Sequence, residues 1–253
     1  MISILKYISH LLFRLLGFDV IRYYKNPYNT LLGLKKYPIK TILDIGANIG
    51  QSAKIYRGIF PDATIYSFEP LPDIYDQLKI YSHTQNGKII PINIALGDQR
   101  EDKLMYEGIN FSPSSSFLPI TDISKNLFPQ TENIQEKIVR VDRLDNIAEN
   151  LSLIPEILIK MDVQSYEKNV IQGGIETLKK AIGCIIEISI FPLYEGQPSF
   201  TDINNLLSLI GYEYNGNLDQ IYDTSGEVIY FDAVFINKLR VKELKNINYD
   251  YKR

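Results

Sequence analysis

A glycine-rich turn early in the chain carries residue types that bind nucleosides. Asp44 lies near the end of the apolar run 41–45, and Gly46, Asn48 and Gly50 follow it at alternate positions. Glycine at the end of a strand lets the backbone approach a ligand closely. The dinucleotide fingerprint needs glycine where Asn48 stands, so that a pyrophosphate can come close. The turn therefore favours a ligand without phosphates, although it could also be a simple strand-to-helix connection.

A second acidic residue, Glu69, follows the next apolar run, residues 63–68. A carboxylate at a strand tip can accept strong charge-assisted hydrogen bonds from both hydroxyls of a ribose. Asn93, Ala95 and Gly97 come at the end of the third run, where we expect the adenine of such a ligand. The alternative for Glu69 is a solvated strand end.

Two further acids, Asp162 and Glu187, end the fourth and fifth apolar runs. The tips of these strands are neighbours in a doubly wound sheet and face one cleft. A carboxylate there could act as a general base that takes a proton from a hydroxyl, with Asp162 the first candidate and Glu187 the second. The alternatives are a helix N-cap for Asp162 and an ion pair for Glu187, with Lys160 among its possible partners.

A metal site at Asp162 and Glu187 is a further hypothesis, because a divalent cation also lowers the pKa of a hydroxyl. His10 and His83 are the only histidines, and they are far apart in the sequence. Any metal would therefore bind to oxygen atoms, which favours Mg²⁺. The sequence allows this ion but does not require it.

Two residues are candidates for contact with the substrate whose hydroxyl loses the proton, which we call the acceptor. Ser116 belongs to a polar loop, residues 108–117, that has neither helical nor strand periodicity. Long loops inside a domain are usually functional, and we expect this one to cover the acceptor site. Tyr194 follows the fifth run and could stack on a sugar or polyketide ring. Ordinary loop packing is the alternative for both residues.

Apolar runs and amphipathic stretches alternate along the chain, which predicts an α/β fold with a doubly wound, mostly parallel sheet. A late hairpin is expected from residues 212–217 and 230–236, and two strands in the insert from 104–106 and 137–141. The runs are residues 41–45, 63–68, 89–95, 157–161, 182–188 and 230–236, and the helical stretches are 51–60, 73–81, 167–178 and 200–210.

The N-terminal residues 1–21 have apolar side chains at helical spacing, interrupted by Lys6, His10 and Arg14. We predict an amphipathic helical extension that packs on the main domain or at a dimer contact, with peripheral membrane binding as the alternative. The predicted divisions are the helix and connector (1–40), the main domain (41–240) and a C-terminal tail (241–253). The oligomeric state stays open.

Composition narrows the partners and the compartment. The 253 residues carry a formal net charge of −3, which predicts no general attraction to nucleic acid. Cys184 is the only cysteine, so an intramolecular disulfide is impossible. This fits a reducing cytoplasm, and binding of residues 1–21 would place the protein at the inner membrane face.

The chain resembles the FkbM-type methyltransferases over roughly residues 41–215. The resemblance rests on residues 44–50, 68–70, 95–98, 141–145 and 159–167, followed by Glu187. It implies a class I methyltransferase-like Rossmann fold with a seven-stranded sheet, S-adenosylmethionine as cofactor, and methylation of hydroxyls on natural products, sugars and glycans. It also implies a catalytic role for Glu167, which could instead stabilise a helix start. Ser165 departs from the family, which has glycine there.

These residues favour an O-methyltransferase that acts on a small molecule or glycan, with a cell-surface polysaccharide sugar as the preferred acceptor. A polyketide or other natural product is the alternative acceptor. A protein that binds the cofactor without turnover is a second hypothesis. A nicotinamide-dependent oxidoreductase is disfavoured, since Asn48 replaces the glycine it needs.

Overall fold

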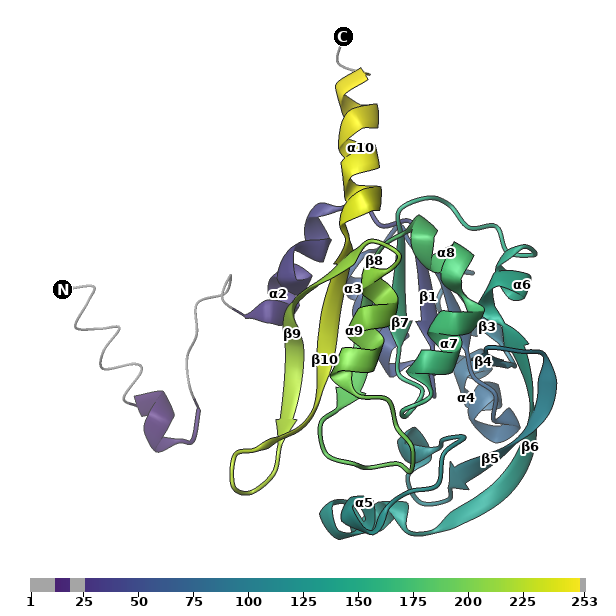
Figure 1. Cartoon of the computed structure of the whole chain (residues 1–253), viewed down its shortest axis with the longest axis vertical. Helices are drawn as coiled ribbons and strands as arrows, with labels where there is room; N and C mark the ends of the chain where they lie inside the picture. The colour runs from purple at the N-terminus through teal and green to yellow at the C-terminus, as the bar shows by residue number, and fades with distance from the viewer. Residues whose placement is uncertain (1–11, 19–25, 251–253) are drawn as a thin grey trace.

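A seven-stranded sheet forms the centre of the computed structural model, which describes residues 12–18 and 26–250 (Figure 1). The strand β10 runs antiparallel to both of its neighbours, while the pairs from β3 to β8 are parallel. This confirms the predicted doubly wound fold with its late hairpin. The strands, in order across the sheet, are β3 (Ile89–Ile92), β2 (Thr64–Phe68), β1 (Thr41–Ile45), β7 (Ile157–Met161), β8 (Ala181–Ser189), β10 (Val228–Asn237) and β9 (Tyr212–Tyr222).

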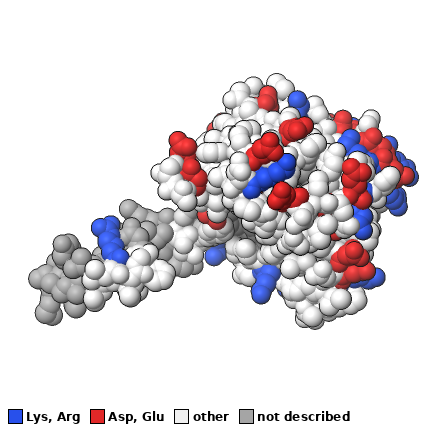
Figure 2. Space-filling model, turned by 90° about the horizontal axis from the view of Figure 1, so that it is seen from below, with Lys and Arg blue, Asp and Glu red and all other residues white. Residues whose placement is uncertain are grey.

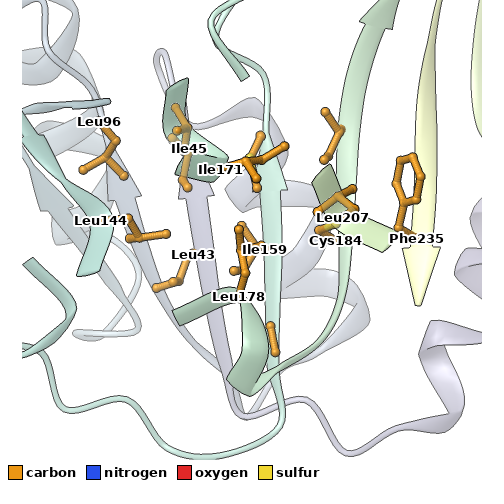
Figure 3. Close-up of a cluster of buried hydrophobic side chains, with 14 of the residues drawn as sticks. Leu43, Ile45, Leu96, Leu144, Ile159, Ile171, Leu178, Cys184, Leu207 and Phe235 are labelled. Carbon is orange, nitrogen blue, oxygen red and sulfur yellow. The ribbon is translucent and has the colours of Figure 1, made fainter. Parts of the chain in front are cut away.

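Helices cover both faces of the sheet, because successive side chains of a strand point to opposite faces and both sets are apolar. Leu43 and Ile45 pack on one face with α6 (Leu144–Ala148), α7 (Glu167–Gly173), α8 (Ile175–Lys180) and α9 (Phe200–Ser208). Figure 3 shows this cluster, which includes the buried Cys184. Ile42 packs on the other face with α3 (Gln51–Ile59), the 3-10 helix η2 (Leu31–Lys36) and α10 (Lys238–Asp250).

The run 89–95, which we predicted as one strand, forms two. The helix α4 (Pro72–His83) joins β2 to β3, which belongs to the large sheet. The next strand, β4 (Ala95–Gly97), belongs to a second, smaller sheet. The small sheet has the order β4-β6-β5, with β5 (Glu101–Gly108) antiparallel to β6 (Ile134–Arg143). These two strands contain the pair predicted in the insert. Between them lie η3 (Ser112–Ser114), α5 (Asp122–Leu127) and η4 (Pro129–Thr131).

The helical stretch 167–178 is also divided, into α7 and α8, at Gly174. The break lies where α7 packs closely on β4. A Cβ atom on Gly173 would lie 1.8 Å from the carbonyl oxygen of Gly97, and one on Gly174 would lie 2.8 Å from the Leu144 side chain. Helical periodicity reports one continuous apolar face, so it could not reveal this division.

The N-terminal segment is described only in part, since residues 1–11 and 19–25 lie outside the described residues. Residues 12–15 are helical, and Leu15, Leu16 and Phe18 are exposed. Within the expected connector, Leu31 and Leu34 are fully buried in the core. No helix among the described residues is long and apolar enough to span a membrane. The three predicted divisions of the chain stay predictions.

Candidate active site

A pocket opens where β1, β2 and β7 end, at the carboxyl edge of the large sheet, as expected for a ligand site in an open α/β sheet. Four of the residues predicted to bind the cofactor, and one predicted catalytic acid, line it. They are Gly46, Asn48, Glu69, Ala95 and Asp162, beside Ile45, Phe68, Pro70, Leu71, Ile94, Leu96, Met105, Ser112, Pro113, Ser115, Phe117, Val163 and Gln164, among others.

The turn after β1 needs glycine at position 46 for two reasons. Its φ is +78°, and a Cβ atom there would lie 1.9 Å from the carbonyl oxygen of Asp162. The chain passes this closely because the Asp162 N–H donates to the Ile45 carbonyl at 3.0 Å. Gly46 therefore lets the ends of β1 and β7 meet at the pocket floor.

Glu69 joins the two turns that form the pocket. The Asn48 N–H donates to its Oε2 at 3.0 Å, and the Leu71 N–H donates to its Oε1 at 2.9 Å. The side chain is 5% exposed, and this burial raises the pKa of Glu69 to about 7. Each carboxylate oxygen can accept a second hydrogen bond, so Glu69 retains one acceptor position on each oxygen for a ligand.

The opposite side of the pocket is apolar and is closed by the insert. Ile94, Leu96, Met105 and Phe117 line it. The loop that precedes Phe117 is held against the β1 turn, because Asn48 Nδ2 donates to Ser112 Oγ at 3.0 Å. The predicted covering loop therefore borders this pocket.

The other four predicted cofactor residues do not line the pocket, and their contacts are structural. Asp44 is buried and accepts from Ser67 Oγ at 3.2 Å, and burial raises the pKa of Asp44 to about 7. Gly50 begins α3 with φ +96°. Asn93 Nδ2 donates to the carbonyl oxygens of Glu69 and Pro70, at 2.9 and 3.0 Å. A Cβ atom on Gly97 would lie 2.8 Å from Val141 Cγ1 and 3.3 Å from the Tyr166 ring, so glycine there leaves room for these two side chains.

Gln164 connects the two predicted catalytic acids. Its Nε2 lies 2.8 Å from Asp162 Oδ1 and 2.8 Å from Glu187 Oε1, so one amide group donates to both carboxyl groups. Tyr194 Oη donates to Gln164 Oε1 at 2.7 Å, and Ser116 Oγ donates to its carbonyl oxygen at 2.6 Å. Asp162 and Glu187 are therefore brought together as predicted, through a residue that we did not predict.

Lys160 supplies the positive charge beside these acids. Its Nζ lies 2.8 Å from Asp232 Oδ1 and 3.7 Å from Asp162 Oδ2, and its side chain is 5% exposed. The neighbouring carboxylates raise the pKa of Lys160 well above its usual range, against the opposing effect of burial. Burial, followed by the charge of Asp162, raises the pKa of Glu187 well above its usual range. Lys160 thus pairs with Asp162 and Asp232, and no direct ion pair with Glu187 forms.

The sequence model described as the methyltransferase FkbM domain matches residues 44–214, more than half of the chain. The chain belongs to the FkbM methyltransferase family. It is 30% identical to the 2-O-methyltransferase NoeI of Sinorhizobium fredii over 191 residues, which cover 71% of this chain and 76% of that relative.

Two further proteins are similar to this chain over about half of their own length. The hexuronic acid methyltransferase AglP of Haloferax volcanii is 27% identical over 145 residues, which are 57% of this chain and 54% of that relative. The crystal structure of the FkbM methyltransferase of Methylobacillus flagellatus matches with a TM-score of 0.52 at 15% identity, over 85% of this chain and 49% of that one. The latter supports the fold alone.

In this FkbM methyltransferase, Glu167 shapes the loop after β7. It is 2% exposed, and its Oε1 accepts the N–H groups of Val163 and Ser165 at 3.0 and 3.3 Å. Burial raises the pKa of Glu167 to about 7. Because Glu167 does not line the pocket, its contacts match the structural alternative better than a catalytic role. Ser165 has φ +73°, a conformation that favours the glycine of the family.

The two predicted acceptor residues, Ser116 and Tyr194, do not line the pocket either. Ser116 is 1% exposed and Tyr194 is 3% exposed. Ser116 Oγ also accepts from the Leu118 N–H, and Tyr194 Oη lies 3.0 Å from the Ser114 carbonyl oxygen. Both residues hold the covering loop against Gln164, which makes them structural supports of the site.

The surroundings of Asp162 and Glu187 do not fit the divalent cation that we considered. The amide N–H₂ of Gln164 is directed at both carboxyl groups, and the Lys160 ammonium lies beside Asp162. Mg²⁺ instead needs oxygen ligands at those positions. Nowhere in residues 12–18 and 26–250 does a group of three or more His, Cys, Asp or Glu side chains come together to hold a metal.

Proposed function

We propose that this methyltransferase transfers a methyl group from S-adenosylmethionine to a hydroxyl of a sugar. The observation that carries the proposal is that Glu69, Asp162 and Gln164 line the same pocket. The names of the two curated relatives, a 2-O-methyltransferase and a hexuronic acid methyltransferase, support an oxygen acceptor and a sugar respectively.

The residues of the pocket suit the nucleoside part of the cofactor. Glu69 has a free acceptor position on each carboxylate oxygen, as the two ribose hydroxyls require. Ile94, Ala95, Leu96 and Met105 supply an apolar side for an adenine ring. When bound, S-adenosylmethionine supplies a methyl group that its positively charged sulfur already activates. The protein therefore has to orient the acceptor oxygen and receive its proton.

Asp162 is our candidate for the proton acceptor. Its side chain is 32% exposed and lines the pocket, while Gln164 and Lys160 fix its two oxygen atoms. It would hydrogen-bond the acceptor hydroxyl and hold the proton that this hydroxyl loses. Glu187 shares the Gln164 amide and is the second candidate. Lys160 Nζ lies 3.7 Å from Asp162 Oδ2 and places a positive charge beside it.

The first experiment separates cofactor binding from turnover. S-adenosylhomocysteine should bind wild-type protein in calorimetric titration, whereas NAD should not, and neutral sugar glycosides should accept a methyl group. The variant Asp162→Asn should bind S-adenosylhomocysteine and lose transfer, while the exposed Asp76→Asn on α4 should behave as wild type. Transfer only to phenolic polyketides, with all sugars inert, would refute the sugar acceptor.

A protein that binds the cofactor without turnover is the second candidate. Ser165 favours it, since its φ of +73° places a side chain where the family has glycine, two residues before Glu167. Binding of S-adenosylhomocysteine without transfer to any acceptor in a broad panel would support this candidate. Restored transfer in Ser165→Gly would identify Ser165 as the cause.

Contact of residues 1–21 with the inner membrane face stays part of the proposal. Leu15, Leu16 and Phe18 are 77%, 70% and 64% exposed, so residues 12–18 have apolar side chains available to a membrane surface or to a second copy. Sedimentation with and without anionic lipid vesicles distinguishes these two partners. A monomer that ignores vesicles would contradict both.

A further inference from the structure

A second cavity lies on the far side of Glu187 from the pocket. The two are adjacent, because Gln164 lines the pocket and donates to Glu187, which lines the second cavity. Its lining residues lie near the end of β8 and along β9 and β10. These strands are on the side of the sheet away from β2 (Figure 1). The lining residues of the second cavity are Glu187, Asp219, Gln220, Ile221, Tyr230, Phe231 and Asp232.

The groups in this cavity suit a sugar ring. Gln220 donates one amide hydrogen to Tyr222 Oη and accepts from Asn217 Nδ2, which leaves one N–H and one acceptor position for a hydroxyl. Tyr230 supplies apolar aromatic surface for the carbon side of the ring, whereas the next side chain, Phe231, points to the opposite face and packs against Phe200 in the core. Glu187 lies at the boundary with the pocket, so a hydroxyl bound beside it would be near Asp162, which shares the Gln164 amide with Glu187.

The charges around the cavity are mainly negative. Asp219 and Asp232 line it, and Asp162 lies beyond Gln164. Lys160 is buried, and its nitrogen already lies 2.8 Å from Asp232 Oδ1. Even with Glu187 protonated, three carboxylates therefore face one ammonium group that is already engaged.

No lysine or arginine in the part of the chain that the structure describes lines either cavity. Figure 2 views the side on which α5 lies and shows charges of both signs interspersed, without a continuous basic patch. A carboxylate on the acceptor would be desolvated there without a cationic partner, close to charges of its own sign.

We propose that the acceptor sugar binds in the cavity that Glu187, Asp219 and Asp232 line, and that it must be uncharged at the ring, so that uronic acids are excluded. This inference rests on the proposed sugar O-methyltransferase activity and names its substrate class. It distinguishes this chain from its relative named as a hexuronic acid methyltransferase.

The test compares matched acceptors with the full-length protein. Nitrophenyl glycosides of glucose, galactose and mannose are assayed beside the corresponding uronides and the methyl esters of those uronides. The neutral glycoside of at least one configuration should have a kcat/KM at least tenfold above its uronide, a difference of about 1.4 kcal/mol. The methyl ester should recover most of that loss, because it keeps the size of the uronide and removes its charge.

A pair of variants locates the selectivity in this cavity. Asp219 accepts a hydrogen bond from Tyr28 Oη at 2.9 Å, which the amide of Asp219→Asn can still accept. This variant should lower the ratio of kcat/KM for the neutral glycoside to kcat/KM for its uronide by about threefold or more. Glu227→Gln removes an equal charge from an exposed position on the same hairpin, outside the cavity, and should leave the ratio unchanged.

Equal methylation of glycosides and uronides would overturn the inference and leave the proposed function standing. A methyl ester as poor as the uronide would also overturn it, since the selectivity would then be steric. Binding of S-adenosylhomocysteine without transfer to any of these sugars would instead refute the sugar acceptor itself.

Discussion

Replacement of Glu69 tests the assignment of the pocket most directly. In the ligand-free protein its two oxygens accept the N–H groups of Asn48 and Leu71, at 3.0 and 2.9 Å. Glu69→Ala removes both acceptors together with the carboxylate that would bind the ribose. Glu69→Gln keeps the shape and one acceptor oxygen, but it presents an N–H₂ group to the other N–H.

The size of the effect follows from the hydrogen bonds that are lost. A hydrogen bond to a charged group contributes about 1.5–3 kcal/mol, and two ribose hydroxyls would make two of them. Since water can enter the vacated space, we expect a net loss of about 3 kcal/mol in binding, roughly a hundredfold in Kd. The free N–H groups of Asn48 and Leu71 should also lower the stability of the Ala variant, by about 1–3 kcal/mol for each N–H left without a partner.

Calorimetric titration with S-adenosylhomocysteine gives the affinity, and thermal unfolding shows whether each variant is folded. Glu69→Gln should be intermediate between wild type and Glu69→Ala. Asp76→Asn, an exposed acid on the following helix, should change neither quantity. An unchanged affinity in both Glu69 variants would refute the assignment of this pocket to the cofactor.

Three other outcomes are expected from the same geometry. Burial raises the pKa of Glu69 to about 7, so the carboxyl of the ligand-free protein is mostly protonated at pH 6. The affinity for S-adenosylhomocysteine should therefore rise by up to about tenfold from pH 6 to pH 8. This pH dependence should vanish in Glu69→Gln. Gly46→Ala should lower the Tm by several degrees more than Gly196→Ala. Both glycines have positive φ, but only the Cβ atom at position 46 would clash, 1.9 Å from the Asp162 carbonyl oxygen. Equal losses of Tm in the two variants would contradict this. Ser165→Gly should raise the free energy of unfolding by about 0.5–1 kcal/mol in urea titrations, because it relieves a φ of +73°, and a lower stability would contradict this reasoning.

Periodicity in the sequence was sufficient for the large sheet. The runs 41–45 and 157–161 became β1 and β7 with the same bounds, because central parallel strands are continuous apolar segments. Periodicity failed for the run 89–95, because the chain leaves one sheet at Ile92 and enters another at Ala95. An apolar run shows that residues are buried, but it does not show which sheet they join.

Position in a motif was a weaker guide to the role of each residue. Asp44 and Glu69 both lie at strand ends, yet only Glu69 lines the pocket. The side chain of Asp44 is directed at Ser67 on the neighbouring strand. Gly97 was predicted beside adenine, and in the structure its lack of a side chain leaves room for the side chains of Val141 and Tyr166. The predicted contacts of both residues with the cofactor stay untested.

Gln164 could not have been recognised from the sequence, because its role depends on four segments that meet only in the fold. It stands in the segment that carries the family resemblance, yet an amide has no chemistry of its own there. In the structure it holds Asp162 and Glu187 together and is itself held by Tyr194. Gln164→Leu should therefore reduce transfer at least tenfold. It should also move the acidic limb of the pH profile to higher pH, since loss of the Gln164 donor would raise further the pKa of Glu187, which burial already holds well above its usual range. Reduced transfer with an unchanged pH profile would mean that Gln164 only fills space between the two acids.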